Sequence, residues 1–226
     1  MSSYVLVHGG FGGGWVWDDV AERLASDGHR LHVVDRLPSA GTDPRSLGDM
    51  TADADHVRQM LDELDEPAVL VGHSYSGMVI TELADHPKVR HSVYLCALWP
   101  QRGQSALNLM GDALPPSFFA RDDGAMQITE DFDVAWQAFC PDMDRAAAER
   151  MISRSVLQSY SSAITPSTAP DRAHPATYII ATGETDGSVV AQESRAARAD
   201  HVTRIPAAHM AQLSRPDEVA AALTAI

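Results

Sequence analysis

Short apolar segments alternate with helical patterns along most of the chain. Six of these segments are aliphatic or β-branched and span residues 4–7, 31–34, 68–71, 92–95, 178–181 and 202–205. Strands that are buried on both faces of a parallel sheet have this continuous apolar character. The pattern therefore predicts an α/β fold in which about six parallel strands are flanked by helices.

Helical periodicity is strongest between the second and third of these segments. Residues 51–64 carry apolar side chains at helical spacing and carboxylates on the opposite face, which predicts an amphipathic crossover helix. Further helices are predicted over 78–84 and 218–223. The last one follows Pro216, and proline is favoured in the first turn of a helix.

The alternation stops between residues 98 and 174. This part of the chain is punctuated by prolines and holds four of the five Phe residues. We expect a small helical cap here, inserted between two strands of a single domain whose core comprises residues 1–97 and 175–226. Such a cap would cover the carboxyl ends of the strands, where open α/β sheets bind ligands. The alternative is a satellite core without a functional role.

Charge and cysteine content narrow the class of partner. The chain has 17 Lys and Arg against 31 Asp and Glu, a net charge of −14, which repels nucleic acids and anionic membranes. Cys96 and Cys140 lack the paired spacing of a zinc or redox site, so no metal is expected. A basic leader and an apolar run of the ~20 residues that span a membrane are both missing, which predicts a cytoplasmic protein.

The strongest local motif lies where the third strand segment meets a predicted helix. Residues 72–77 read Gly-His-Ser-Tyr-Ser-Gly, between apolar residues on both sides. A serine on such a sharp strand-to-helix turn exposes its hydroxyl above the sheet, as a nucleophile requires. Ser76 stands where a second glycine is usual, but serine is also small. A short motif of this kind can arise by chance, yet its context indicates that Ser74 is the nucleophile.

A serine hydroxyl is a weak nucleophile and needs a histidine base from elsewhere in the chain. Three histidines lie far enough downstream of Ser74. His174 precedes a strand and His201 opens one, so both are expected at the surface or at strand entry. His209 follows the last strand and a short loop, where a catalytic base is presented in this order of residues. We predict His209 as the base, against the alternative of a solvated loop side chain.

The base needs a carboxylate that orients its ring and stabilises its charged form. The loop after the strand segment 178–181 offers two, Glu184 and Asp186. Asp186 lies near the tip of the loop, between Thr185 and Gly187, and is the preferred acid. Glu184 remains open as the alternative.

Backbone N–H groups complete the predicted site as an oxyanion hole. Tyr75, directly after the nucleophile, supplies one donor. The glycine-rich loop after the first strand, which begins at His8, supplies the other, because glycines let the backbone approach a substrate closely. A phosphate-binding loop is the competing interpretation, but the glycine spacing and the Lys-Ser/Thr ending of such loops are absent. His8 and His73 are expected to have structural roles.

Three blocks of sequence carry a resemblance to a known family. They are VHGGFGGGWVW at 7–17, GHSYSG at 72–77 and AHMAQLSRP at 208–216. Together they resemble the α/β-hydrolase branch that holds plant methyl-salicylate esterases and hydroxynitrile lyases. The resemblance implies an α/β-hydrolase fold with a small helical cap, ester hydrolysis without a cofactor, and oxyanion donors at Gly10 and Tyr75. It also implies an apolar pocket beneath the cap, with Phe11, Tyr75, Phe118, Phe119, Trp136 and Met210 as candidate lining residues.

The expected activity is cleavage of carboxylic esters of small, mostly apolar substrates through an acyl-enzyme on Ser74. The alternatives are a lyase of the hydroxynitrile type and a protein that binds or shapes a natural product on the same scaffold. In the lyases a threonine follows the loop histidine and a lysine follows the catalytic histidine. Gly9 and Met210 occupy these positions here, which favours ester hydrolysis. The expected partner is a small-molecule ester, and the sequence leaves open whether the chain forms a homodimer.

Overall fold

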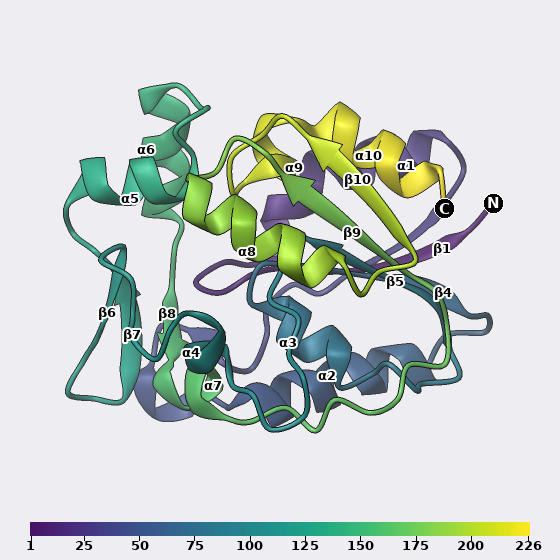
Figure 1. Cartoon of the computed structure of the whole chain (residues 1–226), viewed down its shortest axis with the longest axis horizontal. Coiled ribbons are helices and arrows are strands. Elements are labelled where there is room, and N and C mark those ends of the chain that lie inside the picture. Colours follow the sequence, from purple (N-terminus) through teal and green to yellow (C-terminus); the bar gives the residue numbers. More distant parts are fainter.

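A six-stranded parallel sheet forms the centre of the computed structural model, which describes the whole chain except the side chain of Asp186 (Figure 1). All neighbouring strands in it are parallel, in the order β10-β9-β5-β4-β1-β2. Their bounds are β1 Ser3–Val7, β2 Arg30–Val33, β4 Ala68–His73, β5 Val89–Leu95, β9 Ala176–Ala181 and β10 His201–Ile205. The predicted sheet is therefore confirmed.

Helices cover both faces of this sheet. Alternate residues of each strand point to opposite faces, so β1 buries Val5 and Val7 on one side and Leu6 on the other. The first face packs against α2 (Met50–Asp62) and α3 (Ser76–Thr81). The second face packs against η1 (Gly14–Trp17), α1 (Asp18–Ser26), α9 (Ala211–Ser214) and α10 (Pro216–Thr224). Figure 1 shows α2 and α3 on the opposite side of the sheet from α1 and α10.

The predicted helices are confirmed as α2, α3 and α10, with shifted ends. Helix α2 begins where Asp49 accepts a hydrogen bond from the backbone N–H of Ala52, a capping contact that satisfies one free donor. Helix α3 begins earlier than predicted, immediately after the turn that holds Ser74. In the described part of the chain, no helix combines the length and the apolar character that crossing a membrane requires.

The segment between β5 and β9 contains strands as well as the predicted helices. Its helices are α4 (Ala106–Leu109), α5 (Phe132–Phe139), α6 (Arg145–Ser153) and α7 (Tyr160–Ile164). Its strands are β6 (Phe118–Ala120), β7 (Ala125–Ile128) and β8 (Leu157–Ser159). They form an antiparallel sheet with β3 (Ala40–Gly41). Strand β3 lies between β2 and the short 3-10 helix η2 (Pro44–Ser46) in the sequence.

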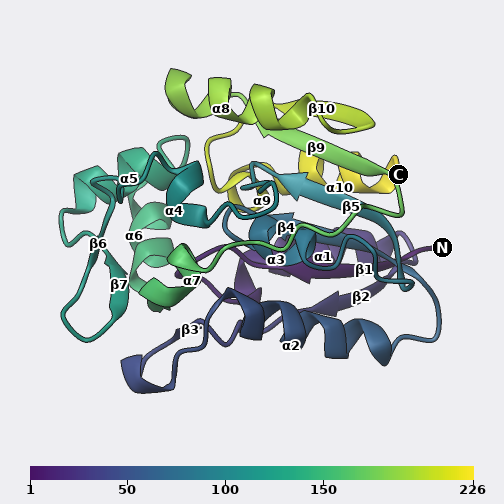
Figure 2. The same ribbon diagram turned by 60° about the horizontal axis from the view of Figure 1, so that its bottom comes forward.

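The expectation of a purely helical cap is thus corrected. Strands of three or four residues are too short for their periodicity to distinguish them from helical turns. The pairing of β3 with β8 also joins segments more than a hundred residues apart. Figure 2 shows the inserted elements gathered at one end of the main sheet.

His174, which is expected at the surface or at strand entry, lies at the entry to β9 and is buried there. His174 is 8% exposed, and its Nε2 lies 2.7 Å from the Ser92 hydroxyl of β5. Burial lowers the pKa of His174 to about 4, so the ring is neutral at physiological pH. His201, by contrast, is exposed at the start of β10, as expected.

Candidate active site

Ser74 occupies a sharp turn between β4 and α3. Its φ angle is +55°, a conformation that is strained for a residue with a side chain. The turn is held by its own backbone: the Ser74 N–H donates to Leu95 O at 3.2 Å, and the Ser74 carbonyl accepts from Leu98 N at 2.9 Å. A Cβ at Gly77 would collide with the carbonyl oxygen of Leu98, so the helix after the turn needs glycine there.

Ser76 strengthens this turn. Its hydroxyl lies 2.9 Å from two carbonyl oxygens to which it donates, those of Val7 in β1 and His73 in β4. A glycine at this position would leave the contact with β1 unmade. The departure from the usual glycine therefore fastens the turn to the neighbouring strand.

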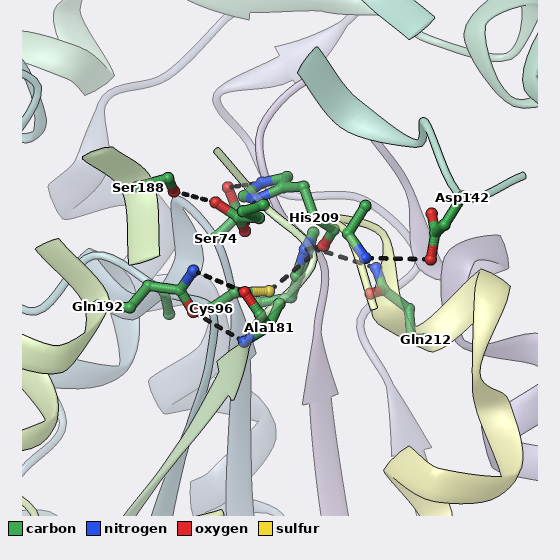
Figure 3. Close-up of polar contacts among 12 residues, drawn as sticks. Ser74, Cys96, Asp142, Ala181, Ser188, Gln192, His209 and Gln212 are labelled. Atoms are coloured by element: carbon green, nitrogen blue, oxygen red, sulfur yellow. Dashed lines mark hydrogen bonds and ion pairs between the residues drawn. The ribbon is translucent and has the colours of Figure 1, made fainter. Parts of the chain in front are cut away.

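His209 lies between Ser74 and Glu184. Its Nε2 is 2.8 Å from Ser74 Oγ, and its Nδ1 is 2.8 Å from Glu184 Oε1. An ionised carboxylate can only accept, so Nδ1 carries the proton and Nε2 accepts the hydrogen bond from the Ser74 hydroxyl. Figure 3 shows the side chains of Ser74 and His209 meeting at the ends of the strands.

The Glu184 side chain is only 9% exposed. Burial by itself raises the pKa of its carboxyl group, but the facing His209 ring and the Ser188 hydroxyl hold the pKa below its ordinary value. Glu184 is therefore ionised at neutral pH and can stabilise a positive charge on His209.

The sequence preferred Asp186 as the partner of His209, and the observed partner is Glu184, the alternative. Asp186 is the first residue of α8 (Asp186–Ala196), and its side chain lies outside the described residues. The loop before it is tight: Gly183 N–H donates to Ala207 O at 2.8 Å. A Cβ at Gly183 would lie 2.9 Å from that oxygen, so glycine brings this loop against the loop that carries His209. The residue after Gly183 consequently faces the His209 ring.

Three polar contacts hold these two loops. Gln192 of α8 exchanges hydrogen bonds with both backbone groups of Ala181, at 3.0 and 3.3 Å, which ties α8 to the end of β9. On the other side, Ala208 N–H donates to Asp142 in the insertion at 3.0 Å. These side chains surround the site in Figure 3. Both the acid and the base candidates are therefore placed by contacts outside their own loops.

His8 and His73 hold the backbone around the site. The Nδ1 atom of His8 donates to Gly9 O at 2.7 Å, and its Nε2 accepts from Leu37 N at 3.0 Å. The Nε2 atom of His73 donates to His209 O at 2.9 Å. Burial lowers the pKa of His8 to about 4 and that of His73 to about 3, so both rings stay neutral near pH 7. Their contacts agree with the structural roles expected for them.

The glycine loop lies against the turn at Ser74. A Cβ at Gly9 would be 2.9 Å from His73 Nδ1 and 3.0 Å from Ser74 Cβ. The corresponding position at Gly10 is 3.7 Å from Tyr75 Cβ. Among the described residues, neither the Gly10 nor the Tyr75 N–H has a hydrogen-bond partner within the chain. Both groups are therefore available to an oxygen bound beside Ser74.

A cavity of about 1250 Å³ opens over Ser74 and His209. Part of its wall comes from the residues that follow five strands of the main sheet, namely Gly9, Ser74, Cys96, Gly183 and Ala208. The inserted elements supply apolar side chains, among them Leu109, Met110, Phe118, Met126, Ile128 and Phe139. The site thus lies between the carboxyl ends of the strands and the insertion.

The structure puts four of the six candidate pocket residues on the cavity wall: Phe11, Tyr75, Phe118 and Met210. The other two, Phe119 and Trp136, are not among the described residues that line the cavity. Phe119 is 42% exposed, because it faces away from its neighbour Phe118 in strand β6. The indole of Trp136 donates to Met143 O at 3.2 Å, inside the insertion. The prediction that Phe119 and Trp136 line the pocket is therefore wrong.

His73, Cys96 and His209 bring three potential metal-binding atoms within 4.8 Å of one another. Hydrogen bonds already engage these groups: the Cys96 thiol donates to His209 O at 3.3 Å, the same oxygen that accepts from His73. Burial raises the pKa of the Cys96 thiol well above its usual range, and a thiol must lose its proton to bind a metal. The trio therefore serves to hold the His209 loop.

Two curated relatives are similar to part of the chain. A carbendazim hydrolyzing esterase of Nocardioides sp. (strain SG-4G) is 41% identical over 128 residues, which cover 54% of this chain and 52% of the esterase. The polyneuridine aldehyde esterase of Rauvolfia serpentina is 34% identical over 109 residues, which cover 45% of this chain and 41% of that enzyme. The chain thus spans about half the length, or less, of these relatives.

A pyrethroid hydrolase from Sphingobium faniae JZ-2 shares the fold over nearly the whole length of both chains. Its solved structure matches with a TM-score of 0.82 at 24% identity, covering 99% of this chain and 96% of that chain. The sequence model of the alpha/beta hydrolase family matches residues 4–222, a range that reaches all six strands of the main sheet and includes Ser74, Glu184 and His209. The resemblance seen in the sequence is confirmed, and the chain belongs to the alpha/beta hydrolase family.

Proposed function

We propose that the protein is a serine hydrolase that cleaves carboxylic esters of small, mostly apolar substrates. One observation carries this proposal: the contacts from Glu184 through His209 to Ser74 are continuous, and they end at the floor of the cavity. Both curated relatives described above are named as esterases, which supports the same reaction class.

The first half of the reaction forms an acyl-enzyme. Ser74 Oγ attacks the ester carbonyl carbon while its proton passes to His209 Nε2, and the negative Glu184 carboxylate stabilises the resulting imidazolium. The carbonyl oxygen becomes an oxyanion that accepts hydrogen bonds from the free N–H groups of Gly10 and Tyr75. When the tetrahedral intermediate collapses, His209 returns the proton to the leaving alcohol, and the acyl group stays on Ser74.

The second half uses water. A water molecule loses a proton to the neutral His209 and attacks the acyl carbon, giving a second oxyanion at the same position. Collapse of this intermediate releases the carboxylic acid and returns the proton to Ser74 Oγ. No cofactor is needed for either step.

The cavity wall indicates the class of ester. Apolar groups from Phe11, Phe118 and Met210 line the space beside Ser74. Binding there would remove the hydrocarbon parts of a substrate from water, which is favourable. The volume of about 1250 Å³ slightly exceeds the usual range for small-ligand sites, roughly 300 to 1000 Å³. The space therefore suits an ester with groups on both the acyl and the alcohol side.

Two positions argue against a hydroxynitrile lyase. A side chain at Gly9 would crowd His73 Nδ1 at 2.9 Å, so a threonine hydroxyl has no room unless the loop moves. Met210, which follows His209, lines the cavity with a neutral thioether and has no charge to stabilise departing cyanide. Both features suit hydrolysis of an apolar ester.

We expect Ser74→Ala and His209→Ala each to lower kcat on an aryl or short alkyl ester by roughly 10⁴-fold or more. The double variant should be hardly worse than either single one, because the two groups act as a unit. The measurement is steady-state hydrolysis by variants whose circular dichroism matches that of the wild type. A natively folded Ser74→Ala protein that retains a tenth of the activity would rule out this nucleophile.

We expect Glu184→Gln to lower kcat by roughly 10²- to 10⁴-fold with little change in KM, because an amide does not stabilise the His209 imidazolium. Asp186→Asn is the matched control, since it removes the same charge two residues further along the loop. A large loss in Asp186→Asn together with near-normal activity in Glu184→Gln would return the role of the acid to Asp186.

We expect ester hydrolysis without measurable release of cyanide from mandelonitrile above the uncatalysed background. The reason is the neutral Met210 beside His209, where a lyase needs a positive charge. Cyanide formation at a rate comparable with ester turnover, and lost in Ser74→Ala, would establish the lyase instead. If neither reaction occurred, a ligand-binding protein would be the better account.

A further inference from the structure

Both backbone segments that carry the proposed oxyanion donors are attached to one buried polar network. The Tyr75 hydroxyl donates to Asp53 Oδ2 at 2.7 Å. On the other side, the N–H of Phe11, one residue after Gly10, donates to Gln158 Oε1 at 3.2 Å. Asp53 belongs to α2 and Gln158 to β8, so the network joins the core to the insertion.

Ser39 connects these two side chains. Its N–H donates to Asp53 Oδ1 at 2.7 Å and its hydroxyl donates to Oδ2 of the same carboxylate, while its oxygen accepts from Gln158 Nε2 at 2.6 Å. The amide nitrogen of Gln158 also donates to Ser162 Oγ at 2.8 Å. Both amide hydrogens of Gln158 are thus used, which leaves its oxygen facing Phe11 and fixes its orientation.

The network is almost completely buried, and only Tyr75 and Gln158 of its members reach the cavity wall. Asp53, Ser39 and Ser162 have no exposed surface, and Gln158 is 2% exposed. Burial raises the pKa of Asp53 to about 6, against the hydrogen bonds from Ser39 and Tyr75 that lower it, so the group is a carboxylate at neutral pH. Asp53 also lies on the apolar face of α2, with Met50, Ala54 and Val57. An apolar residue there would pack without the cost of burying a charge, so packing alone does not account for Asp53.

The backbone is strained on both sides of the proposed oxyanion hole. Phe11 has a φ of +59° and Ser74, directly before Tyr75, has +55°. Such conformations persist only where surrounding contacts hold them. Phe11 is held at both of its peptide groups, since its carbonyl also accepts from Val156 N at 2.9 Å. The network therefore contacts both strained segments, which carry the Gly10 and Tyr75 N–H groups that must point to the same oxyanion.

We propose that Asp53, Ser39 and Gln158 are positioning residues that align the N–H groups of Gly10 and Tyr75 for the tetrahedral intermediate. This inference rests on the proposed esterase function. Donors that are aligned in advance stabilise the oxyanion without reorganising during the reaction. A loosened hole loses this stabilisation but still binds the ester, whose neutral carbonyl oxygen depends less on the donors.

The test uses Tyr75→Phe and Asp53→Asn in the full chain, with an activated aryl ester as substrate. Each variant should lower kcat by roughly 10-fold or more, less than the loss of a whole donor, and change KM by less than about 2-fold. A trifluoromethyl ketone serves as the second probe: Ser74 adds to its carbonyl carbon, His209 takes the proton, and the ketone oxygen becomes the oxyanion. Its inhibition constant should rise in proportion to the fall in kcat/KM.

Tyr94→Phe is the matched control. Tyr94 is a fully buried tyrosine of β5 whose hydroxyl lies 3.0 Å from Thr81 Oγ1, so the change removes the same atom from the same core. We expect its kcat and its ketone inhibition constant to stay within about 2-fold of the wild type. This control separates a loss of core hydrogen bonding from a loss of alignment.

Natively folded Tyr75→Phe with wild-type kcat and ketone affinity would overturn the positioning role, as would a loss confined to KM. Tyr75→Phe leaves Asp53 both of its contacts with Ser39, so it decides the matter even if Asp53→Asn fails to fold. Wild-type protein that neither hydrolyses esters nor binds the ketone would overturn the proposed function, and the role of the network with it.

Discussion

The strained turn at Ser74 is the constraint on which the rest of the site depends. A φ of +55° lets the chain leave β4 and enter α3 within two residues, which lifts the hydroxyl clear of the sheet. The conformation is held by contacts with three other segments: Leu95 at the end of β5, Leu98 after it, and Val7 of β1 through Ser76. The nucleophile candidate is therefore positioned by the buried centre of the sheet.

The parallel sheet then determines what can meet Ser74. All six strands end at the same edge, so the loops after β1, β9 and β10 converge on the turn after β4. Close approach at Gly9 and Gly183 removes the space that side chains would need between these loops. His209 and the N–H of Gly10 thereby reach Ser74, and Glu184 reaches His209, from segments far apart in the sequence. The insertion covers this edge and contributes many apolar side chains to the cavity wall above Ser74 and His209.

Much of this arrangement could be predicted because the evidence for it is local. The six strands are continuous apolar runs, and the turn at Ser74 and the loop at His209 each follow such a run. The partner of His209 could not be settled in this way, because the choice between Glu184 and Asp186 depends on the contact of Gly183 with Ala207, which joins two loops. Pairing of β3 with β8 is likewise invisible in a local pattern.

The Asp53 network was missed although the sequence held a signal for it. A carboxylate on the apolar face of an otherwise amphipathic helix indicates a buried polar contact, and Asp53 is such a residue in α2. Phe119 and Trp136 are expected in the pocket only from the family resemblance, which implies an apolar pocket beneath the cap. Which face of a three-residue strand or a short helix points inward is decided by packing, and composition does not report it.

The central claim is that ester cleavage proceeds through a covalent bond to Ser74. Mass spectrometry of the protein, quenched in acid during turnover of an activated ester, tests it most directly. The account predicts a mass increase of one acyl group per chain, located in the peptide that contains Ser74 and absent from Ser74→Ala. Turnover without any adduct on that peptide, or an acyl group on another residue, would contradict it.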